Sequence, residues 1–241
     1  MPLIGKIALI TGGSRGIGRA MAGALVREGA AVAISGRTER DLETAAAELS
    51  ATASQSGAPP VLTVRADVGR SAEATQLVDE AARHFGGLDV LVNNAGVGFF
   101  SPVADLPLER WEETMATNLS APFYCARAAI PHLRRRGGGW IINISSLAGK
   151  NPFAGGGAYC ASKAALNAFS EVLMQEVRFD DIKVSYILPG SVQTRFSGHD
   201  EAGADWKIDP DEVAQVVLDL LHQAPRSLSS RIELRPSKPR K

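Results

Sequence analysis

Short apolar runs alternate with longer segments of helical pattern along almost the whole chain. The runs are apolar at nearly every position, which is typical of parallel strands that are covered on both faces. Seven strands are expected, at residues 6–11, 31–35, 61–66, 89–94, 140–145, 183–188 and 231–234. Six helices are expected, at residues 16–29, 38–52, 71–85, 107–136, 157–179 and 210–223.

This alternation defines the expected fold class. Strands that are separated by helices form right-handed βαβ units. The pattern therefore predicts an α/β protein with a doubly wound parallel sheet, a Rossmann fold of about seven strands with helices on both faces. Residues 1–241 contain no internal repeat and no linker, so a single nucleotide-binding domain is expected. Residues 195–209 lack periodicity, and a loop of that length is either functional or disordered.

Two local signals mark boundaries of elements. "DPDE" at 209–212 places Asp209 before Pro210, with Glu212 three residues after the aspartate. That arrangement indicates an N-cap with a capping box at the start of the last helix. "QSGAPP" at 55–60 predicts a loop between the second helix and the third strand.

Composition and charge narrow the classes of function. Lys plus Arg and Asp plus Glu number 26 each, which gives no reason to expect nucleic acid or a membrane as a partner. Cys125, Cys160 and the four scattered histidines show no metal-ligand spacing, so no metal site is expected. The sequence has no signal-peptide pattern and no apolar run of membrane-spanning length. A soluble cytoplasmic protein is therefore expected.

A glycine-rich turn, "TGGSRGIG" at 11–18, follows the first strand and opens the first helix. Glycines 12, 16 and 18 allow a tight turn and close approach of the backbone to a phosphate, which would meet the amides of the helix N-terminus. Alone, such a turn is a weak signal, because any tight βα loop can contain glycines. Its place in a chain of repeated βα units favours dinucleotide binding.

The spacing Gly-x-x-x-Gly-x-Gly, together with "NNAG" at 93–96, resembles the short-chain dehydrogenase/reductase family, in particular its NADP-preferring carbonyl and 3-oxoacyl reductases. The resemblance covers almost the whole chain in the family's order. It includes Asn118 in "ATNL", Ser146 in "NISS", "YCASK" at 159–163 and "PGSVQT" at 189–194. No single motif is decisive, but the ordered set is highly specific.

The predicted topology agrees with this resemblance. Four polar or glycine-rich patches each follow the carboxyl end of a predicted strand, which is the edge where open α/β sheets bind ligands. The patches are Thr11 with Gly12, residues 93–96, Ser145 with Ser146, and Pro189 with Gly190.

The second strand bears on the choice of cofactor. NAD-preferring members of the family carry an acidic residue at its end, and the matching position here is Gly36. Arg37 follows it, and Arg15 lies in the glycine-rich turn. Either arginine alone is equally well explained as an exposed residue at the start of a helix. Together with the missing carboxylate, the two arginines favour NADP(H), because a guanidinium makes forked contacts to phosphate.

The resemblance implies a wider set of cofactor contacts, in which Asp67 and Val68 lie on the adenine side. The implied set is Gly12, Ser14, Arg15, Gly16, Ile17, Gly18, Arg37, Asp67, Val68, Asn94, Ala95, Gly96, Tyr159, Lys163, Pro189, Gly190, Val192 and Thr194.

The catalytic set centres on Tyr159 and Lys163, which lie four residues apart and therefore on one face of a helix. A nearby ammonium is expected to lower the pKa of a tyrosine hydroxyl from about 10. By the resemblance, Lys163 also binds the nicotinamide ribose, Ser146 polarises the substrate carbonyl, and Asn118 anchors a water molecule linked to Lys163. Ser145 is the alternative candidate for the role of Ser146 in polarising the substrate carbonyl. Taken alone, Tyr159 and Lys163 are better explained as an amphipathic surface pair; the joint arrangement with Ser146 and Asn118 favours catalysis.

The leading hypothesis is an NADP-dependent oxidoreductase that transfers a hydride between NADPH and a ketone or 3-oxoacyl substrate, with Tyr159 as the acid–base group. The alternative is a non-catalytic module that senses NADP(H) on the same fold. The substrate is expected to be selected by residues 96–102, 149–157 and 195–209, with Phe99, Phe100 and Phe153 as an apolar wall. The resemblance also implies a homodimer or homotetramer with helices 107–136 and 157–179 at the main interface.

Overall fold

The structure is a computed structural model, and it describes residues 2–194, 196 and 205–239. Its centre is a parallel sheet of seven strands in the order β3-β2-β1-β4-β5-β6-β7. This topology confirms the predicted doubly wound fold. The strands are β1 (Ile7–Ile10), β2 (Ala31–Gly36), β3 (Leu62–Arg65), β4 (Val90–Asn93), β5 (Gly139–Ile144), β6 (Ile182–Pro189) and β7 (Arg231–Leu234).

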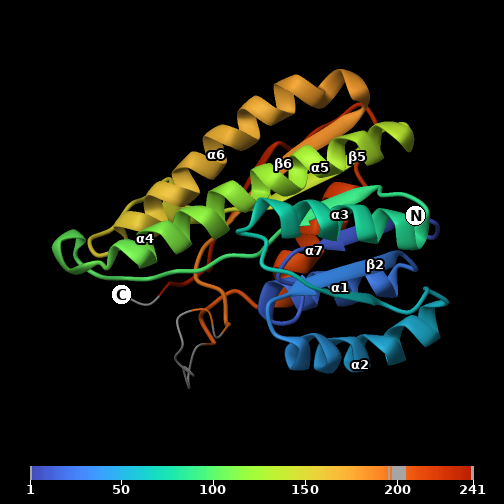
Figure 1. Cartoon of the computed structure of the whole chain (residues 1–241), viewed down its shortest axis with the longest axis horizontal. Coiled ribbons are helices and arrows are strands. Elements are labelled where there is room, and N and C mark those ends of the chain that lie inside the picture. The colour runs from blue at the N-terminus through green and yellow to red at the C-terminus, as the bar shows by residue number, and fades with distance from the viewer. Residues whose placement is uncertain (1, 195, 197–204, 240–241) are drawn as a thin grey trace.

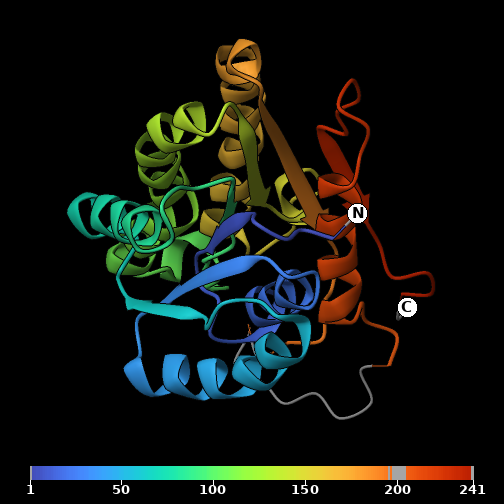
Figure 2. The same cartoon turned by 90° about the vertical axis from the view of Figure 1, so that its right-hand side faces the viewer.

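Helices cover both faces of the sheet, as Figures 1 and 2 show. On one face pack α1 (Gly16–Arg27), α2 (Glu39–Ser56) and α7 (Pro210–Leu221). On the other face pack α3 (Ser71–Phe85), α5 (Ala121–Arg135) and α6 (Gly157–Val177). Each face has its own hydrophobic core, so the sheet is the middle of three layers.

The two cores explain why the strands are apolar at almost every position. In β1, Ala8 and Ile10 point into the core under α1, whereas Ile7 and Leu9 point into the core under α3. Successive side chains of a strand alternate between faces, so a strand buried on both faces needs apolar residues throughout. The continuous apolar runs of the sequence follow from this packing.

The predicted helix 107–136 is interrupted in the structure. It consists of α4 (Leu108–Met115), a π-helical segment η2 (Ala116–Ser120) and α5. A π-helical turn contains an extra residue, and such turns are frequent at functional sites. Here the segment holds Asn118, whose side chain binds the loop after β4. The predicted bounds agree with the structure, which is helical from Leu108 to Arg135, but the periodicity did not indicate the π-helical segment.

Two other boundaries test the local signals. The second helix was expected to end at residue 52, but α2 continues to Ser56 and ends at Gly57, which has a left-handed φ of 74°. The predicted loop 55–60 is therefore wrong at its first two residues, because the helix stops only where glycine allows the left-handed conformation. At α7 the predicted capping box is confirmed: the Asp209 carboxylate accepts from the Asp211 amide and Glu212 accepts from the Asp209 amide.

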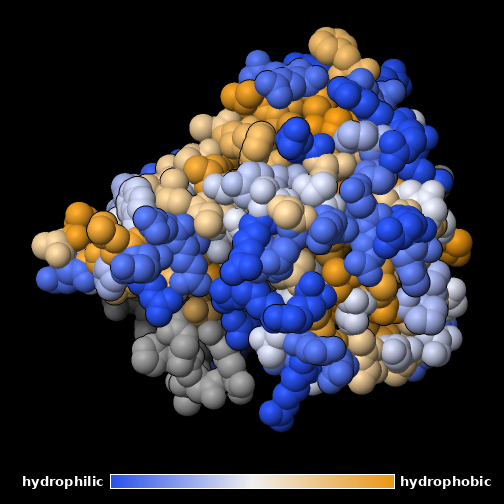
Figure 3. Space-filling view, in the orientation of Figure 1, coloured by the Kyte–Doolittle hydropathy of each residue, from blue (hydrophilic) through white to orange (hydrophobic). Residues whose placement is uncertain are grey.

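The helices expected at a subunit interface carry exposed apolar side chains. In Figure 3, apolar patches lie among polar ones on the surface over α5 and α6. Phe123 on α5 and Val172 on α6 are about half exposed. The expected homodimer or homotetramer stays a prediction.

Candidate active site

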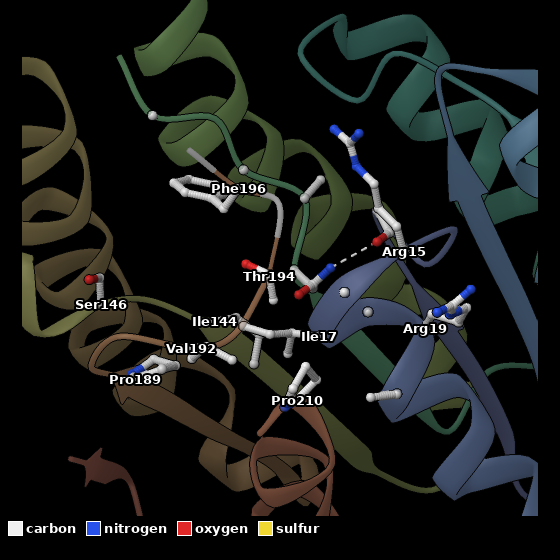
Figure 4. Close-up of a pocket in the computed structure, with 18 of the residues that line it drawn as sticks. Arg15, Ile17, Arg19, Ile144, Ser146, Pro189, Val192, Thr194, Phe196 and Pro210 are labelled. Atoms are coloured by element: carbon white, nitrogen blue, oxygen red, sulfur yellow. Dashed lines mark hydrogen bonds between the residues drawn. The ribbon is translucent and has the colours of Figure 1, made fainter. Parts of the chain in front are cut away.

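A cleft of about 1850 Å³ lies along the carboxyl ends of the strands. Every predicted cofactor-binding residue lines it, together with Ser146, Tyr159 and Lys163. Figure 4 shows Arg15 and Ile17 on the α1 side of this cleft and Ser146 and Val192 on the opposite side. The four patches that the sequence placed at one edge of the sheet therefore line a single cleft. Of the expected loop 195–209, residues 195 and 197–204 lie outside the described residues.

The glycine-rich turn is held tightly against the loop after β4. Gly12 has a φ of 64°, and a Cβ added there would lie 2.9 Å from the Cα of Ala95. A Cβ at Gly18 would overlap the carbonyl oxygen of Gly12. The Asn94 amide donates hydrogen bonds to the carbonyl oxygens of Thr11 and Gly12, at 2.9 and 3.0 Å. The turn is therefore built from backbone groups that leave no room for side chains.

Thr11, which was named in the first strand-end patch but not among the predicted binding residues, is a structural member of this site. Its hydroxyl oxygen accepts hydrogen bonds from the backbone amides of Asn94 and Ala95, each at 3.0 Å. These bonds tie the end of β1 to the loop after β4. The signal was present in the sequence as a hydroxyl side chain placed between the strand and its first glycine.

The end of β2 carries no carboxylate. Gly36 packs against Ser14, whose hydroxyl oxygen would lie 3.2 Å from a Cβ at that position. The guanidinium of Arg37 donates from Nη1 to Oε1 of Glu113 at 3.1 Å. Arg15, at the N-cap of α1, is exposed. Two guanidinium groups therefore lie on the wall of this part of the cleft.

The other end of the cleft holds Tyr159 and Lys163, one turn apart at the start of α6. The Lys163 ammonium is 4% exposed and donates to the carbonyl oxygen of Ile144 at 2.9 Å. It lies 5.9 Å from the centre of the Tyr159 ring. The Ser146 side chain forms a hydrogen bond with Tyr159, and its oxygen also accepts from the Ala148 amide at 3.1 Å. Tyrosine, serine and lysine therefore form one cluster.

Burial controls the acidity of this cluster. It raises the pKa of Tyr159, and the hydrogen bond from Ser146 opposes that rise. Burial also lowers the pKa of Lys163 to about 8. We expected the lysine to lower the pKa of the tyrosine. The net pKa of Tyr159 is nevertheless raised in this structure, because the cost of burying the phenolate exceeds the effect of the Ser146 hydrogen bond.

Ser145 does not compete for the role beside Tyr159. Its hydroxyl donates to Oδ1 of Asn167 at 2.5 Å. Because this hydroxyl is buried and engaged with α6, Ser146 is the serine that contacts Tyr159.

Asn118 lies behind the cleft and is fully buried. Its side chain accepts from the Val97 amide and donates to the Val97 carbonyl, both at 2.9 Å. It also donates to the hydroxyl of Ser162 at 3.0 Å, and Ser162 donates to the carbonyl oxygen of Tyr159 at 2.8 Å. Asn118 therefore joins the loop after β4 to the first turns of α6, which carry Tyr159 and Lys163. Ser162 was missed by the sequence prediction, although it directly precedes Lys163.

Aromatic rings surround Tyr159. The ring of Phe100 lies 5.6 Å from it in an edge-on arrangement, and the ring of Phe196 lies at 5.7 Å. Phe153 lies 5.8 Å from Phe100. All three phenylalanines are about half exposed and line the cleft, so this end has an apolar wall. The wall includes Phe100 and Phe153 as predicted, whereas Phe196 was not singled out.

The described residues lack two kinds of feature, a membrane-spanning helix and a cluster of metal ligands. None of their helices is long and apolar enough to cross a membrane. In the same part of the chain, no three or more His, Cys, Asp or Glu side chains are grouped so that they could hold a metal ion.

Comparison with known proteins gives the class that this fold and site define. The profile of the short chain dehydrogenase family matches residues 6–204. An uncharacterized oxidoreductase of Staphylococcus saprophyticus is 32% identical over 231 residues, which cover 96% of this chain and 97% of the relative. The chain therefore belongs to the short-chain dehydrogenase family, and it is an oxidoreductase of that family.

Solved structures agree with this assignment. An alcohol dehydrogenase from the archaeon Thermococcus sibiricus, complexed with 5-hydroxy-NADP, has a TM-score of 0.89 at 31% identity, and 98% of each chain is covered. A metagenomic short-chain oxidoreductase in complex with NADP has a TM-score of 0.85 at 36% identity, covering 99% of this chain and all of that one. A Burkholderia cenocepacia short chain dehydrogenase in complex with NADP is similar at a TM-score of 0.87 and 34% identity, covering 98% of this chain and 97% of the other.

Proposed function

We propose that this oxidoreductase uses NADP(H) to interconvert a carbonyl compound and an alcohol, with Tyr159 as the acid–base residue. The observation that carries the proposal is the cluster of Tyr159, Ser146 and Lys163 at one end of a cleft whose other end holds a glycine-rich turn. A non-catalytic NADP(H) sensor would need the turn but has no use for the cluster.

The residues present fit a dinucleotide phosphate. Gly12 and Gly18 bring bare backbone to the cleft, and Arg15 at the N-cap of α1 makes no side-chain hydrogen bond to the helix amides. Those amides favour a phosphate at the start of the helix. Arg37 would hold the 2′-phosphate, and Gly36 leaves that region without a repelling carboxylate at the end of β2. The solved relatives that contain NADP or 5-hydroxy-NADP support this choice.

The chemistry follows from the side chains at the other end. Reduced nicotinamide supplies the hydride for the carbonyl carbon. Tyr159 donates its proton to the carbonyl oxygen, on which negative charge develops, and the Ser146 hydroxyl donates a hydrogen bond to the same oxygen. The Lys163 ammonium, held by the Ile144 carbonyl, favours the phenolate that remains on Tyr159. In alcohol oxidation the same proton returns to Tyr159.

The aromatic wall favours a ketone with a flat apolar substituent over a charged substrate. Phe100, Phe153 and Phe196 offer ring faces and edges that another aromatic ring can pack against. Aryl alkyl ketones such as acetophenone are therefore the first substrates to test. A 3-oxoacyl thioester is the comparison substrate, because its long polar carrier arm gains nothing from these rings.

The test is consumption of NADPH and of NADH, followed at 340 nm with acetophenone, acetone and a 3-oxobutanoyl thioester. We expect turnover to be fastest with NADPH and acetophenone. Comparable turnover with NADH would contradict the proposed preference for NADP(H). Faster turnover of the thioester than of acetophenone would contradict the proposed preference for aryl alkyl ketones. Absence of NADPH consumption with every carbonyl, despite tight binding of NADPH, would favour the sensor.

A further inference from the structure

Arg37 is already engaged by a carboxylate of its own chain. Glu113, on α4, accepts from Arg37 through Oε1 at 3.1 Å and from Arg110 through Oε2 at 2.8 Å. Arg37 and Arg110 are about half exposed, whereas Glu113 is more covered. All three residues line the cleft, so the pair lies on the wall where a nucleotide would bind. Nothing in the sequence pattern indicates this contact, because 76 residues separate the two partners.

Glu113 is held at this place from its other side. The Arg110 guanidinium, which binds its second oxygen, lies over the ring of Phe99 at 4.3 Å from the ring centre. A stacked guanidinium loses less freedom when it binds a carboxylate, because its position is already restricted. Release of Arg37 would therefore leave Glu113 paired with Arg110, and its negative charge would stay beside the Arg37 site.

We propose that Glu113 is a specificity-determining residue that weakens binding of the 2′-phosphate of NADP(H) by competing for the Arg37 guanidinium. This inference rests on the proposed function, in which Arg37 binds that phosphate. Glu113 already engages Nη1 of Arg37, so a phosphate that binds this guanidinium would share it with a carboxylate, and the two anions repel each other. NAD(H) has a neutral hydroxyl at the 2′ position, so its binding is not opposed in this way.

The inference has a direct consequence for cofactor choice. The two arginines and Gly36 favour NADP(H), while Glu113 reduces that preference. The discrimination between NADP(H) and NAD(H) is therefore smaller than the arginines alone would produce. Substitution of Glu113 should widen it by strengthening NADP(H) binding without weakening NAD(H) binding.

The experiment measures binding of NADP⁺ and of NAD⁺ by calorimetry, without any carbonyl substrate. We expect Glu113→Gln to tighten NADP⁺ binding about three- to tenfold, the size expected for a partly screened charge contact, and to leave NAD⁺ binding unchanged. The gain should shrink as the salt concentration rises, because the effect is electrostatic. Glu112→Gln is the matched control: it removes the same charge from the same helix at an exposed position outside the cleft.

Three results would overturn the inference. The first is weaker binding of NADP⁺ by Glu113→Gln, which would mean that Glu113 positions Arg37. The second is an equal change in the affinities for NADP⁺ and NAD⁺ in this variant. The third is an equal gain in NADP⁺ affinity in Glu112→Gln. Failure of the proposed cofactor choice looks different. Wild-type protein would then bind NAD⁺ at least as tightly as NADP⁺. The role of Glu113 is tested separately, by the change in the ratio of the two dissociation constants between wild type and Glu113→Gln.

Discussion

The two ends of the cleft are built from different parts of the chain. At the nucleotide end, the glycine-rich turn is built from backbone: Gly12 and Gly18 pack against backbone and amide groups, and Asn94 ties the turn to the loop after β4. At the catalytic end, the wall consists of side chains, with Tyr159 among half-exposed aromatic rings. The glycine-rich turn has no room for added side-chain atoms, whereas the half-exposed rings can be replaced by side chains of other sizes.

This difference indicates how the site divides its tasks. A backbone wall binds groups that are common to every dinucleotide and excludes variation, because each added atom meets main chain. A wall of rings can be altered residue by residue without moving the strands that carry it. Substitutions in the glycine-rich turn should therefore disturb binding and folding together, whereas those in the aromatic wall should alter turnover or substrate choice alone.

The largest effect should come from removing one oxygen at the catalytic end. In Tyr159→Phe the proton donor is lost while the ring and its edge-on contact with Phe100 remain. We expect kcat for ketone reduction to fall roughly thousandfold, in the range for loss of a general acid. Calorimetry should show NADP⁺ binding within about twofold of wild type.

Tyr124→Phe removes the same oxygen from α5, outside the cleft, and should leave kcat unchanged. A Tyr159→Phe variant that keeps near-normal turnover would mean that another group delivers the proton.

The nucleotide end should respond to a single methyl group. In Gly18→Ala the new Cβ overlaps the carbonyl oxygen of Gly12, so the turn must shift. We expect more than tenfold weaker NADP⁺ binding and a loss of about 1–3 kcal/mol in the free energy of unfolding, measured in urea, as for other overpacked sites.

Gly23→Ala places the same methyl group in α1, where its nearest neighbours lie at 3.5 Å. Because alanine favours a helix, this control should be as stable as wild type or more so. Equal losses in both variants would show that the helix, and not the turn, is sensitive.

The pH dependence of the reaction should report the buried lysine. Burial lowers the pKa of Lys163 to about 8, so in the ligand-free protein its ammonium is lost above that pH. The value of kcat/KM with limiting NADPH reflects the ligand-free protein and should fall by up to roughly tenfold per pH unit above about 8. Burial keeps the Tyr159 pKa raised, so loss of its proton should not cause this fall. A profile that stays level to pH 10 would contradict the assignment.

The sequence predicted the sheet better than it predicted the helices. Inner strands such as β1 and β4 are buried at every position, so their apolar runs are nearly as long as the strands. The edge strand β7 is less buried, but it also matches the predicted residues 231–234. The periodicity did not indicate the π-helical segment at Asn118, whose side chain forms hydrogen bonds with the Val97 backbone, 21 residues away in the chain. The same limit explains why Glu113 was missed: its partner Arg37 becomes a neighbour only when β2 and α4 are placed together.

The smallest effect should fall on the aromatic wall. Phe153 is 50% exposed and contacts Phe100, so Phe153→Leu keeps an apolar side chain and removes one ring face. Since a favourable aromatic pair contributes about 0.5–1.5 kcal/mol, KM for acetophenone should rise about three- to tenfold with little change in kcat. KM for acetone, which has no ring, should stay constant. Phe179→Leu, at a 91% exposed surface position, is the control. If KM for acetophenone and KM for acetone rise together in Phe153→Leu, the ring maintains the shape of the cleft and does not contact the substrate ring specifically. The aromatic wall would then be as sensitive to substitution as the glycine-rich turn, although its side chains are exposed.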